Sequence, residues 1–371
     1  MQLIELSFLK KNALNLFSST FDQITLLVGP SGAGKSVIIN FIYMLNILAN
    51  EEPRGEFKWS ATFKDEKCRY FVWSGQTYIK NLDKHQIVFG DESLVMDGRE
   101  IFRNADNEFY YMGENYSKTK FNFDYDKSLL NQLDSEYVKL FIRNINNIVN
   151  ITLKDNDFII DKSKANNFDN FSEVDIDNIY NLSLRLFICF KYYNEKFNIV
   201  KNVFTLFFPY IDDMRFYYVD EYYADNGSLY NDSYILQLKY KDINDWISID
   251  FISEIMLYIL LLITAVYTSD FNGIYLFDEI ENVVDKHNIN LLIDKIFKFK
   301  NKQFIISSHN ENIINAIPSE NWRLVKRNME NISTSRVNNK IFSICRDKPY
   351  IFLANLNELK YAIAHDRSYL D

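Results

Sequence analysis

The sequence has few of the residues that form disulfide scaffolds or metal sites. Its 371 residues include three cysteines, at positions 68, 189 and 345, and four histidines. The cysteines are odd in number and widely spaced, which argues against a disulfide framework and against the paired spacing of zinc ligands. His287 and His365 have no histidine or cysteine partner at metal-ligand spacing. We therefore predict a protein of a reducing compartment, the cytoplasm.

Long hydrophobic runs are missing as well. The longest apolar stretch, Ile255 to Val266, is too short to cross a bilayer and predicts a buried core helix. The first residues, Met1 to Leu6, alternate like a strand and lack the charged and apolar regions of a signal peptide. We predict neither secretion nor a membrane partner.

Positive charge is not in excess either. The chain carries 41 basic and 50 acidic residues, a formal net charge of -9, so it has no broad electrostatic footprint for nucleic acid. One local basic run ends a predicted helix, at Lys295, Lys298, Lys300 and Lys302. These lysines either touch DNA or stay solvated and complement the helix dipole.

A phosphate-binding loop is the most informative feature that the sequence does contain. An apolar run, Ile24 to Val28, predicts a strand, and a G-x-x-x-x-G-K-S motif follows it directly. Backbone N–H groups can wrap a triphosphate only where the chain turns tightly without side chains, as at Gly29, Gly32 and Gly34. The predicted phosphate-binding residues are Gly29, Pro30, Ser31, Gly32, Ala33, Gly34, Lys35 and Ser36.

The last two residues of this loop have separate roles. Lys35 adds a positive charge for the phosphates, and Ser36 supplies a hydroxyl ligand to Mg²⁺. The helix predicted from Val37 to Leu45 directs the positive end of its dipole at the same phosphates. The motif therefore predicts binding of ATP or GTP together with Mg²⁺.

Two further elements complete the predicted site. Ile274 to Phe277 predicts a buried parallel strand that ends in Asp278 and Glu279, a Walker B pattern in which the first acid holds Mg²⁺ and the second activates water. A helix follows, and then a second apolar strand that ends at His309. A right-handed crossover would deliver His309 to the same sheet edge, where it can donate a hydrogen bond to the γ-phosphate.

More than two hundred residues separate Lys35 from Asp278, so a substantial insertion is expected. Its first part, Phe57 to Val88, alternates like antiparallel strands. Two helical stretches follow, Tyr137 to Ile148 and Ile176 to Tyr193, and strands return at Phe216 to Val219 and Tyr234 to Tyr240. No internal repeat and no long heptad run is evident.

With these motifs in this order, the chain resembles the ABC-type ATPases related to SMC and RecF proteins, in particular those of bacterial antiviral operons such as the OLD, Septu and PARIS ATPases. Besides the Walker motifs, the stretches Gly98 to Arg103, Lys127 to Leu133 and Asp278 to Asn282 are similar to family motifs. The resemblance implies an α/β P-loop head with a mixed sheet, an antiparallel β subdomain and an inserted helical domain.

The resemblance divides the chain into four segments. We expect an N-terminal ATPase lobe at 1–125, a helical insertion at 126–205, a C-terminal ATPase lobe at 206–345 and a tail at 346–371. The adenine pocket stays unassigned; Phe8 and Phe17 are candidates for stacking on the base. No guanine-specific Asn-Lys-x-Asp motif is evident, which favours ATP over GTP.

One family motif departs from its pattern. Such ATPases open the helix before Walker B with a glycine-containing signature that contacts the γ-phosphate bound by a partner subunit. Here the matching stretch, Ser248 to Glu254, has no glycine. Ser253 either faces a γ-phosphate across a dimer or simply caps the helix, and hydrolysis is expected to be slow. Asp285 likewise belongs to a loop at the dimer interface or caps the next helix.

The resemblance implies a homodimer or higher homo-oligomer through the ATPase heads, acting as the sensor or scaffold subunit of an anti-phage system. Roughly sixty residues follow His309, too few for the nuclease domain that ends OLD proteins, so a separate nuclease or toxin effector is expected. The alternative is a RecF- or SMC-like DNA-maintenance ATPase that binds DNA directly. A transporter subunit would need an intact signature, which argues against it.

Overall fold

The structure, a computed structural model, describes residues 1–10, 13–81, 86–105, 108–112, 116–117, 124–152, 158–166, 176, 179, 181–223, 229–270, 272–282 and 286–337. The chain forms two compact units. Among the described residues, unit 1 comprises those within 1–148, 273–281 and 302–337, and unit 2 those within 149–272 and 282–301. The segment expected as a helical insertion, 126–205, overlaps unit 2 only from residue 149.

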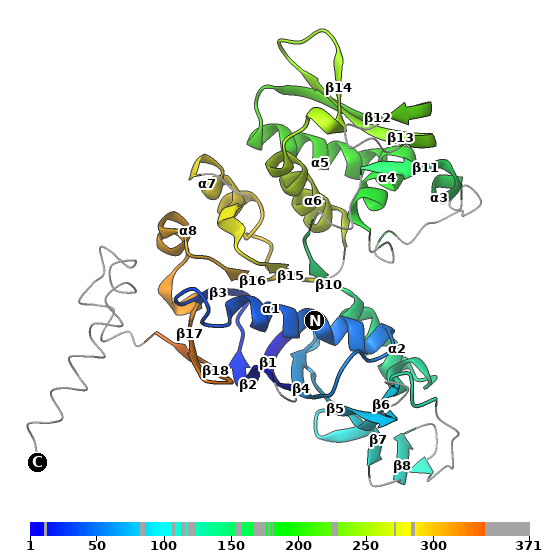
Figure 1. Ribbon diagram of the computed structural model, residues 1–371, viewed down its shortest axis with the longest axis vertical. Coiled ribbons are helices and arrows are strands. Elements are labelled where there is room, and N and C mark those ends of the chain that lie inside the picture. Colours follow the sequence, from blue (N-terminus) through cyan, green and yellow to red (C-terminus); the bar gives the residue numbers. More distant parts are fainter. Residues whose placement is uncertain are drawn as a thin grey trace, which may run out of the picture. The chain divides into compact units, whose positions relative to one another are not determined.

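Unit 1 is built on one long mixed sheet (Figure 1). Among the described residues the strands lie side by side in the order β10-β15-β16-β3-β17-β18-β2-β1-β4-β5-β6-β7-β8-β9. In chain order they are β1 (Gln2–Lys10), β2 (Asn15–Thr20), β3 (Ile24–Val28), β4 (Phe57–Lys64), β5 (Tyr70–Asn81), β6 (Gln86–Met96), β7 (Arg99–Ala105), β8 (Glu108–Met112), β9 (Tyr116–Ser117), β10 (Ile148–Asn150), β15 (Ile274–Phe277), β16 (Gln303–Ser307), β17 (Trp322–Asn328) and β18 (Asn331–Arg336).

Four neighbouring strands of this sheet run parallel. β15 pairs with β16, β16 with β3, and β3 with β17, all in parallel register. The strands β3, β15 and β16 are almost entirely buried, as expected for a parallel sheet covered on both faces. The sequence predicted strands at these three places, and the structure confirms them. Their carboxyl ends meet at one edge, which we call the loop edge because Gly29 follows β3 there.

β18 also pairs in parallel with β2, and from β2 onward, through β1 and β4 to β9, the described pairs are antiparallel. β4, β5 and the beginning of β6 occupy the stretch predicted as antiparallel, Phe57 to Val88. The helices α1 (Lys35–Asn50) and α2 (Glu136–Asn146) contribute buried side chains to the same core as this sheet. Phe8 is fully buried and stacks on Phe41 of α1, with ring centroids 4.4 Å apart, so it is a core residue and does not stack on a base. Phe17 is exposed.

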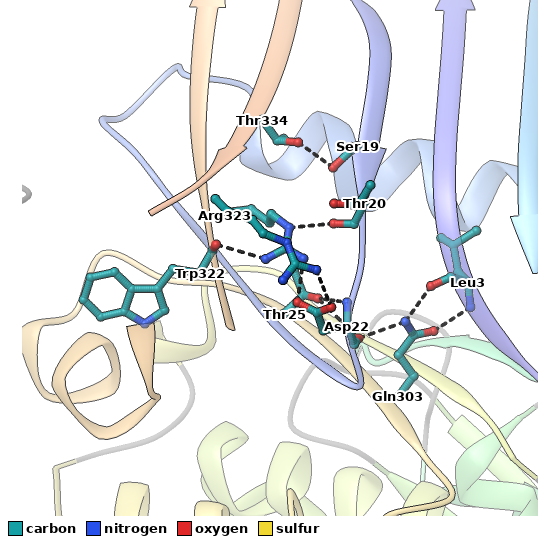
Figure 2. Close-up of polar contacts among 10 residues, drawn as sticks. Leu3, Ser19, Thr20, Asp22, Thr25, Gln303, Trp322, Arg323 and Thr334 are labelled. Carbon is teal, nitrogen blue, oxygen red and sulfur yellow. Dashed lines mark hydrogen bonds and ion pairs between the residues drawn. The ribbon is translucent and has the colours of Figure 1, made fainter. Parts of the chain in front are cut away.

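A cluster of polar side chains closes the other edge of the parallel strands, which we call the clamp edge (Figure 2). Arg323, at the beginning of β17, donates to Asp22 Oδ2 at 2.5 Å and to the Thr20 carbonyl at 2.8 Å. Gln303, the first residue of β16, exchanges two 2.8 Å hydrogen bonds with the backbone of Leu3. These contacts tie β16, β17 and β1 to the turn that precedes β3.

Unit 2 combines helices with a small antiparallel sheet. Its sheet has the order β11-β13-β12, and β14 also pairs with β13. The described strands are β11 (Ile159–Asp161), β12 (Ile211–Tyr223), β13 (Leu229–Tyr240) and β14 (Trp246–Ser248), and the described helices are α3 (Lys162–Asn166), α4 (Leu182–Tyr192), α5 (Asn194–Phe207), α6 (Glu254–Thr268) and α7 (Lys286–Lys295). Phe187 of α4 packs edge-on against Phe216 of β12, with centroids 5.3 Å apart.

The helix α6 occupies the stretch predicted as a buried core helix, and most of its side chains are buried. Its apolar character is therefore explained by packing inside unit 2. No helix in the described part of the chain is long and apolar enough to span a membrane.

Candidate functional site

The glycines of the phosphate-binding loop are required by the local geometry. Gly32 and Gly34 have φ angles of 78° and 102°, in the left-handed region that side-chain-bearing residues rarely adopt. A Cβ on Gly29 would lie 2.6 Å from the carbonyl oxygen of Val325 in β17, and a Cβ on Gly34 would collide with Ile332 of β18. The neighbouring strands thus force a tight loop that exposes backbone rather than side chains.

Lys35 begins α1 and is only 4% exposed. Its Nζ donates hydrogen bonds to the carbonyl oxygens of Gly29 at 2.9 Å and of Pro30 at 3.2 Å. Burial lowers the pKa of Lys35, while the negative charges of Glu281, Glu279 and Asp278 act in the opposite direction. The negative charges of the three acids therefore act on the Lys35 ammonium group.

Asp278 follows β15 and meets the loop across the sheet edge. Its Oδ1 accepts a hydrogen bond from Ser36 Oγ at 3.0 Å and another from Ser307 Oγ at 2.6 Å. The parallel pairing of β15 with β16 and of β16 with β3 brings these residues together, because all three strands end at this edge. Hydroxyl and carboxylate oxygens are the ligands that Mg²⁺ prefers, so Ser36 and Asp278 fit this ion.

Glu279 lies in a tight turn directly after Asp278. Its φ of 49° is unusual for a residue with a side chain, and its backbone N–H donates to Ser307 Oγ at 2.8 Å. Ser307 is fully buried at the end of β16 and so contacts both acidic positions. The apolar pattern before His309 predicts only a strand at Ser307, and the signal for its contacts was a polar side chain at the end of an otherwise apolar strand.

His309 follows β16 at the same edge and is partly exposed. Its backbone N–H donates to Glu281 Oε1, three residues beyond Asp278. Asn310 then caps α8 (Glu311–Ala316) by accepting from the Asn312 N–H at 2.8 Å. The structure thus brings Gly29 to Ser36, Asp278, Glu279 and His309 to one edge of unit 1, and it adds Ser307 and Glu281, to which the sequence analysis assigned no role.

The predicted signature residue Ser253 lies in unit 2. It is the N-cap of α6, with its Oγ accepting from the Met256 N–H at 3.4 Å. Just before it, Asp250 accepts a hydrogen bond from the Tyr222 hydroxyl. Phe251 and Ile255, on either side of Ser253, are exposed.

The remaining residues singled out from the sequence are the lysines of the basic run, Asp285, two cysteine and histidine positions near the C-terminus, and His287. Lys302, predicted as part of a basic run, is buried and donates to the Tyr275 hydroxyl at 3.5 Å, whereas Lys298 is exposed and pairs with Asp294 at 3.2 Å. One of the four lysines is therefore not available to DNA. Asp285, Cys345 and His365 lie outside the described residues, as does the side chain of His287.

An open hollow lies at the loop edge beside the antiparallel strands. It has a volume of about 420 Å³ and lies where β1 ends and β2 and β4 begin. Its lining residues are Leu9, Lys10, Asn15, Glu56, Phe57, Lys58, Gln76, Thr77 and Tyr78. β2, which begins at Asn15, pairs with β18, and Ile332 of β18 contacts Gly34. The hollow is thus linked to the phosphate-binding loop through adjacent strands.

A family model described as the RecF/RecN/SMC N terminal domain matches residues 3–333. The chain belongs to this family. Its members are ATPases, and their fold accounts for the large mixed sheet and the Walker motifs at its edge. No curated protein matches the sequence.

A solved structure supports the same fold. The chain resembles an SMC head crystallised with the C-terminal winged-helix domain of ScpA, with a TM-score of 0.51 and 13% sequence identity. The match covers 91% of this chain and 98% of the SMC head chain. At this identity the likeness concerns the fold alone, which is that of an SMC head-like ATPase.

Proposed function

We propose that this protein binds ATP with Mg²⁺ and hydrolyses it slowly. The observation that carries the proposal is the hydrogen bond between Ser36 and Asp278, because it joins the two Walker motifs across 242 residues of sequence. Hydroxyl and carboxylate oxygens suit Mg²⁺, so Ser36 and Asp278 would hold this ion, which would supply positive charge to the phosphates.

Each residue of the site has a distinct task in this proposal. The backbone N–H groups of the loop and the charge of Lys35 bind the phosphates, and Ser36 and Asp278 hold Mg²⁺, which neutralises charge that develops during phosphoryl transfer. Glu279 orients and polarises the attacking water, and His309 donates a hydrogen bond to the γ-phosphate. The hollow at the beginning of β2, which is linked to the loop through β18, offers apolar and polar groups to the base and ribose.

We further propose that two heads dimerise and that nucleotide acts mainly as a clamp. In such a dimer the N-terminus of α6 would approach the γ-phosphate of the partner. In this chain Ser253 already caps its own helix, and the exposed Ile255 follows where the family has a glycine signature. This stretch offers fewer free N–H groups to a γ-phosphate, which supports slow turnover.

In the cell, we propose a sensor or scaffold subunit of an anti-phage system that controls a separate nuclease or toxin. Recognition of a protein partner is supported by the relative whose SMC head was crystallised with a domain of ScpA. The rival function, direct binding of DNA in DNA maintenance, draws support from the family itself. The net charge of -9 favours the protein partner.

Nucleotide binding and turnover by the purified chain test the enzymatic part. Lys35→Ala should weaken ATP binding by about a hundredfold, since a buried charge that contacts phosphates is lost. Glu279→Gln should bind ATP normally while turnover falls by roughly a hundredfold. Lys298→Ala, an exposed lysine with a surface partner, is the matched control. Normal turnover in Glu279→Gln would refute the assigned role of Glu279.

The cellular part needs a different experiment. Purification of the native complex followed by mass spectrometry should recover a nuclease or toxin subunit. ATP-promoted DNA binding by the isolated chain, with affinity that falls steeply as salt rises, would instead favour the DNA-maintenance role.

A further inference from the structure

Glu281 contacts the candidate site without having been given a role in the proposed reaction. It lies in the short 3₁₀ turn Ile280–Asn282 that follows the two Walker B acids. Its Oε1 accepts the hydrogen bond from the His309 backbone N–H. Its Oε2 is buried and has no hydrogen-bond partner among the described residues.

The charge of Glu281 acts on the same lysine as the two Walker B acids. Glu281, Glu279 and Asp278 each oppose the lowering of the Lys35 pKa that burial causes. Glu281 therefore belongs to the surroundings of the phosphate-binding loop, although it lies farther along the chain from β15 than the other two acids.

Hydrogen bonds running in both directions connect the Walker B turn with the end of β16. The turn donates the Glu279 N–H to Ser307 Oγ, and the loop after β16 donates the His309 N–H to Glu281; Ser307 Oγ also donates to Asp278. Each segment thus both donates to the other and accepts from it. The first bond fixes the backbone that carries the proposed water-activating residue, and the second fixes the backbone that carries the histidine.

We propose that Glu281 is a positioning residue that holds His309 at the nucleotide through its backbone, and so couples the Walker B turn to the histidine loop. This inference rests on the proposed ATPase function. Its second, unpartnered oxygen accepts a hydrogen bond from a water molecule of the nucleotide-bound site, because a buried carboxylate oxygen without a donor is costly.

The acceptor and the charge of Glu281 can be separated by substitution. Glu281→Gln keeps an oxygen that can accept the His309 N–H but removes the charge, whereas Glu281→Ala removes both. Glu281→Asp keeps the charge but is one methylene shorter, so it cannot reach His309. A positioning role predicts that Gln behaves like the native protein while Ala and Asp do not. A role as catalytic base predicts that Gln fails as badly as Ala.

The first measurement is amide hydrogen exchange at His309 in the protein without nucleotide. We expect at least tenfold faster exchange in Glu281→Ala and Glu281→Asp, and native-like protection in Glu281→Gln. Glu311→Ala, which removes an exposed acid two residues beyond His309, is the control and should leave the exchange unchanged. Unchanged protection in both Ala and Asp variants would overturn the inference.

The second measurement separates binding from turnover. In Glu281→Ala, ATP affinity should stay within about twofold of the native value while turnover falls roughly tenfold, and Glu281→Gln should restore turnover to within about threefold. If the native protein neither binds nor hydrolyses ATP, the proposed function fails, while the exchange result still reports on the contact. If native turnover is present and Glu281→Ala matches it, only the positioning role fails. If Glu281→Ala does not fold, the Asp variant decides.

Discussion

The two edges of the parallel strands in unit 1 use buried charge in opposite ways. At the clamp edge, Arg323 is 1% exposed and each of its nitrogens has an acceptor, in Thr20, Trp322 and Asp22. At the loop edge, Lys35 is also buried but donates to carbonyl oxygens of its own loop, and one oxygen of Glu281 has no partner in the described part of the chain.

The difference separates structural polar groups from functional ones. A buried cation whose nitrogens each donate to fixed protein atoms and whose charge is paired with a carboxylate stabilises the fold. A site with spare donors and acceptors costs stability, and a bound ligand can recover that cost. We therefore expect mutations at the clamp edge to change stability and those at the loop edge to change nucleotide binding or turnover.

The largest effect should come from Asp22→Ala. It leaves the buried Arg323 guanidinium without its counter-charge, which should lower the free energy of unfolding by about 3 kcal/mol. Denaturant unfolding measures this loss. Asp294→Ala, which breaks an exposed ion pair 3.2 Å long, is the control and should change stability by less than about 0.5 kcal/mol. A drop in ATP affinity without a loss of stability would contradict the comparison.

Glu92 lies in a second cluster of buried polar groups that hydrogen-bond to one another, as at the clamp edge. This buried carboxylate accepts hydrogen bonds from Ser128 Oγ at 2.6 Å, the Leu129 N–H at 2.8 Å and Trp73 Nε1 at 3.0 Å. Glu92→Ala leaves these donors unsatisfied and should cost about 2 kcal/mol, as measured by denaturant unfolding. Normal stability in this variant would show that these three hydrogen bonds do not stabilise the fold.

The same residue predicts a pH dependence. Burial raises the pKa of Glu92 above its ordinary value of 4.5. The folded state then holds the proton more tightly than the unfolded state, so this contribution to stability is complete below pH 4.5 and declines as pH rises through the raised pKa. Glu92→Gln cannot ionise and should lack the decline. Parallel stability–pH curves for the two proteins would refute this assignment.

Ser307→Ala tests the loop edge. It removes the donor to Asp278 and the acceptor of the Glu279 N–H, so the proposed metal ligand and the turn are less well oriented. We expect about a tenfold higher Mg²⁺ requirement for turnover with little change in stability. Titration of ATPase activity with Mg²⁺ measures the first effect and thermal unfolding the second. A large loss of stability with a native Mg²⁺ requirement would mean that Ser307 stabilises the fold and does not serve the nucleotide site, contrary to our expectation for the loop edge.

The smallest effect should come from Arg336→Ala. This arginine donates to the same Asp22 carboxylate at 2.8 Å but is 60% exposed. Its removal leaves Arg323 paired, so we expect a loss below about 1 kcal/mol, which salt should reduce further. Denaturant unfolding at low and high salt checks this. A loss of stability as large as that of Asp22→Ala would mean that the clamp edge depends on both arginines.

Sequence patterns predicted those elements that are specified by residues close together in the chain. The glycines and Lys35 form a continuous motif, and the strands at Ile24 to Val28 and Ile274 to Phe277 are short apolar runs, so each could be recognised without knowing its neighbours. Ser307 and Glu281 could not be recognised in this way. Their roles depend on which strands pair and in which register.

The side-chain contacts of the clamp edge could not be predicted from the sequence for the same reason. Asp22 and Arg323 are 301 residues apart, and nothing in their local sequence indicates a partner. Phe8 also matched a base-stacking residue by type and position, yet packing against Phe41 makes it part of the core.

The sequence by itself determined that a phosphate-binding loop, a pair of acids and a histidine each follow a buried strand. Only the tertiary structure decided that Asp278 meets Ser36, that Ser307 contacts both acidic positions and that Glu281 accepts from the His309 N–H. The physical reason is that a turn or a cap depends on residues within a few positions. Hydrogen bonds across a sheet depend instead on register, which is set by the packing of the whole core.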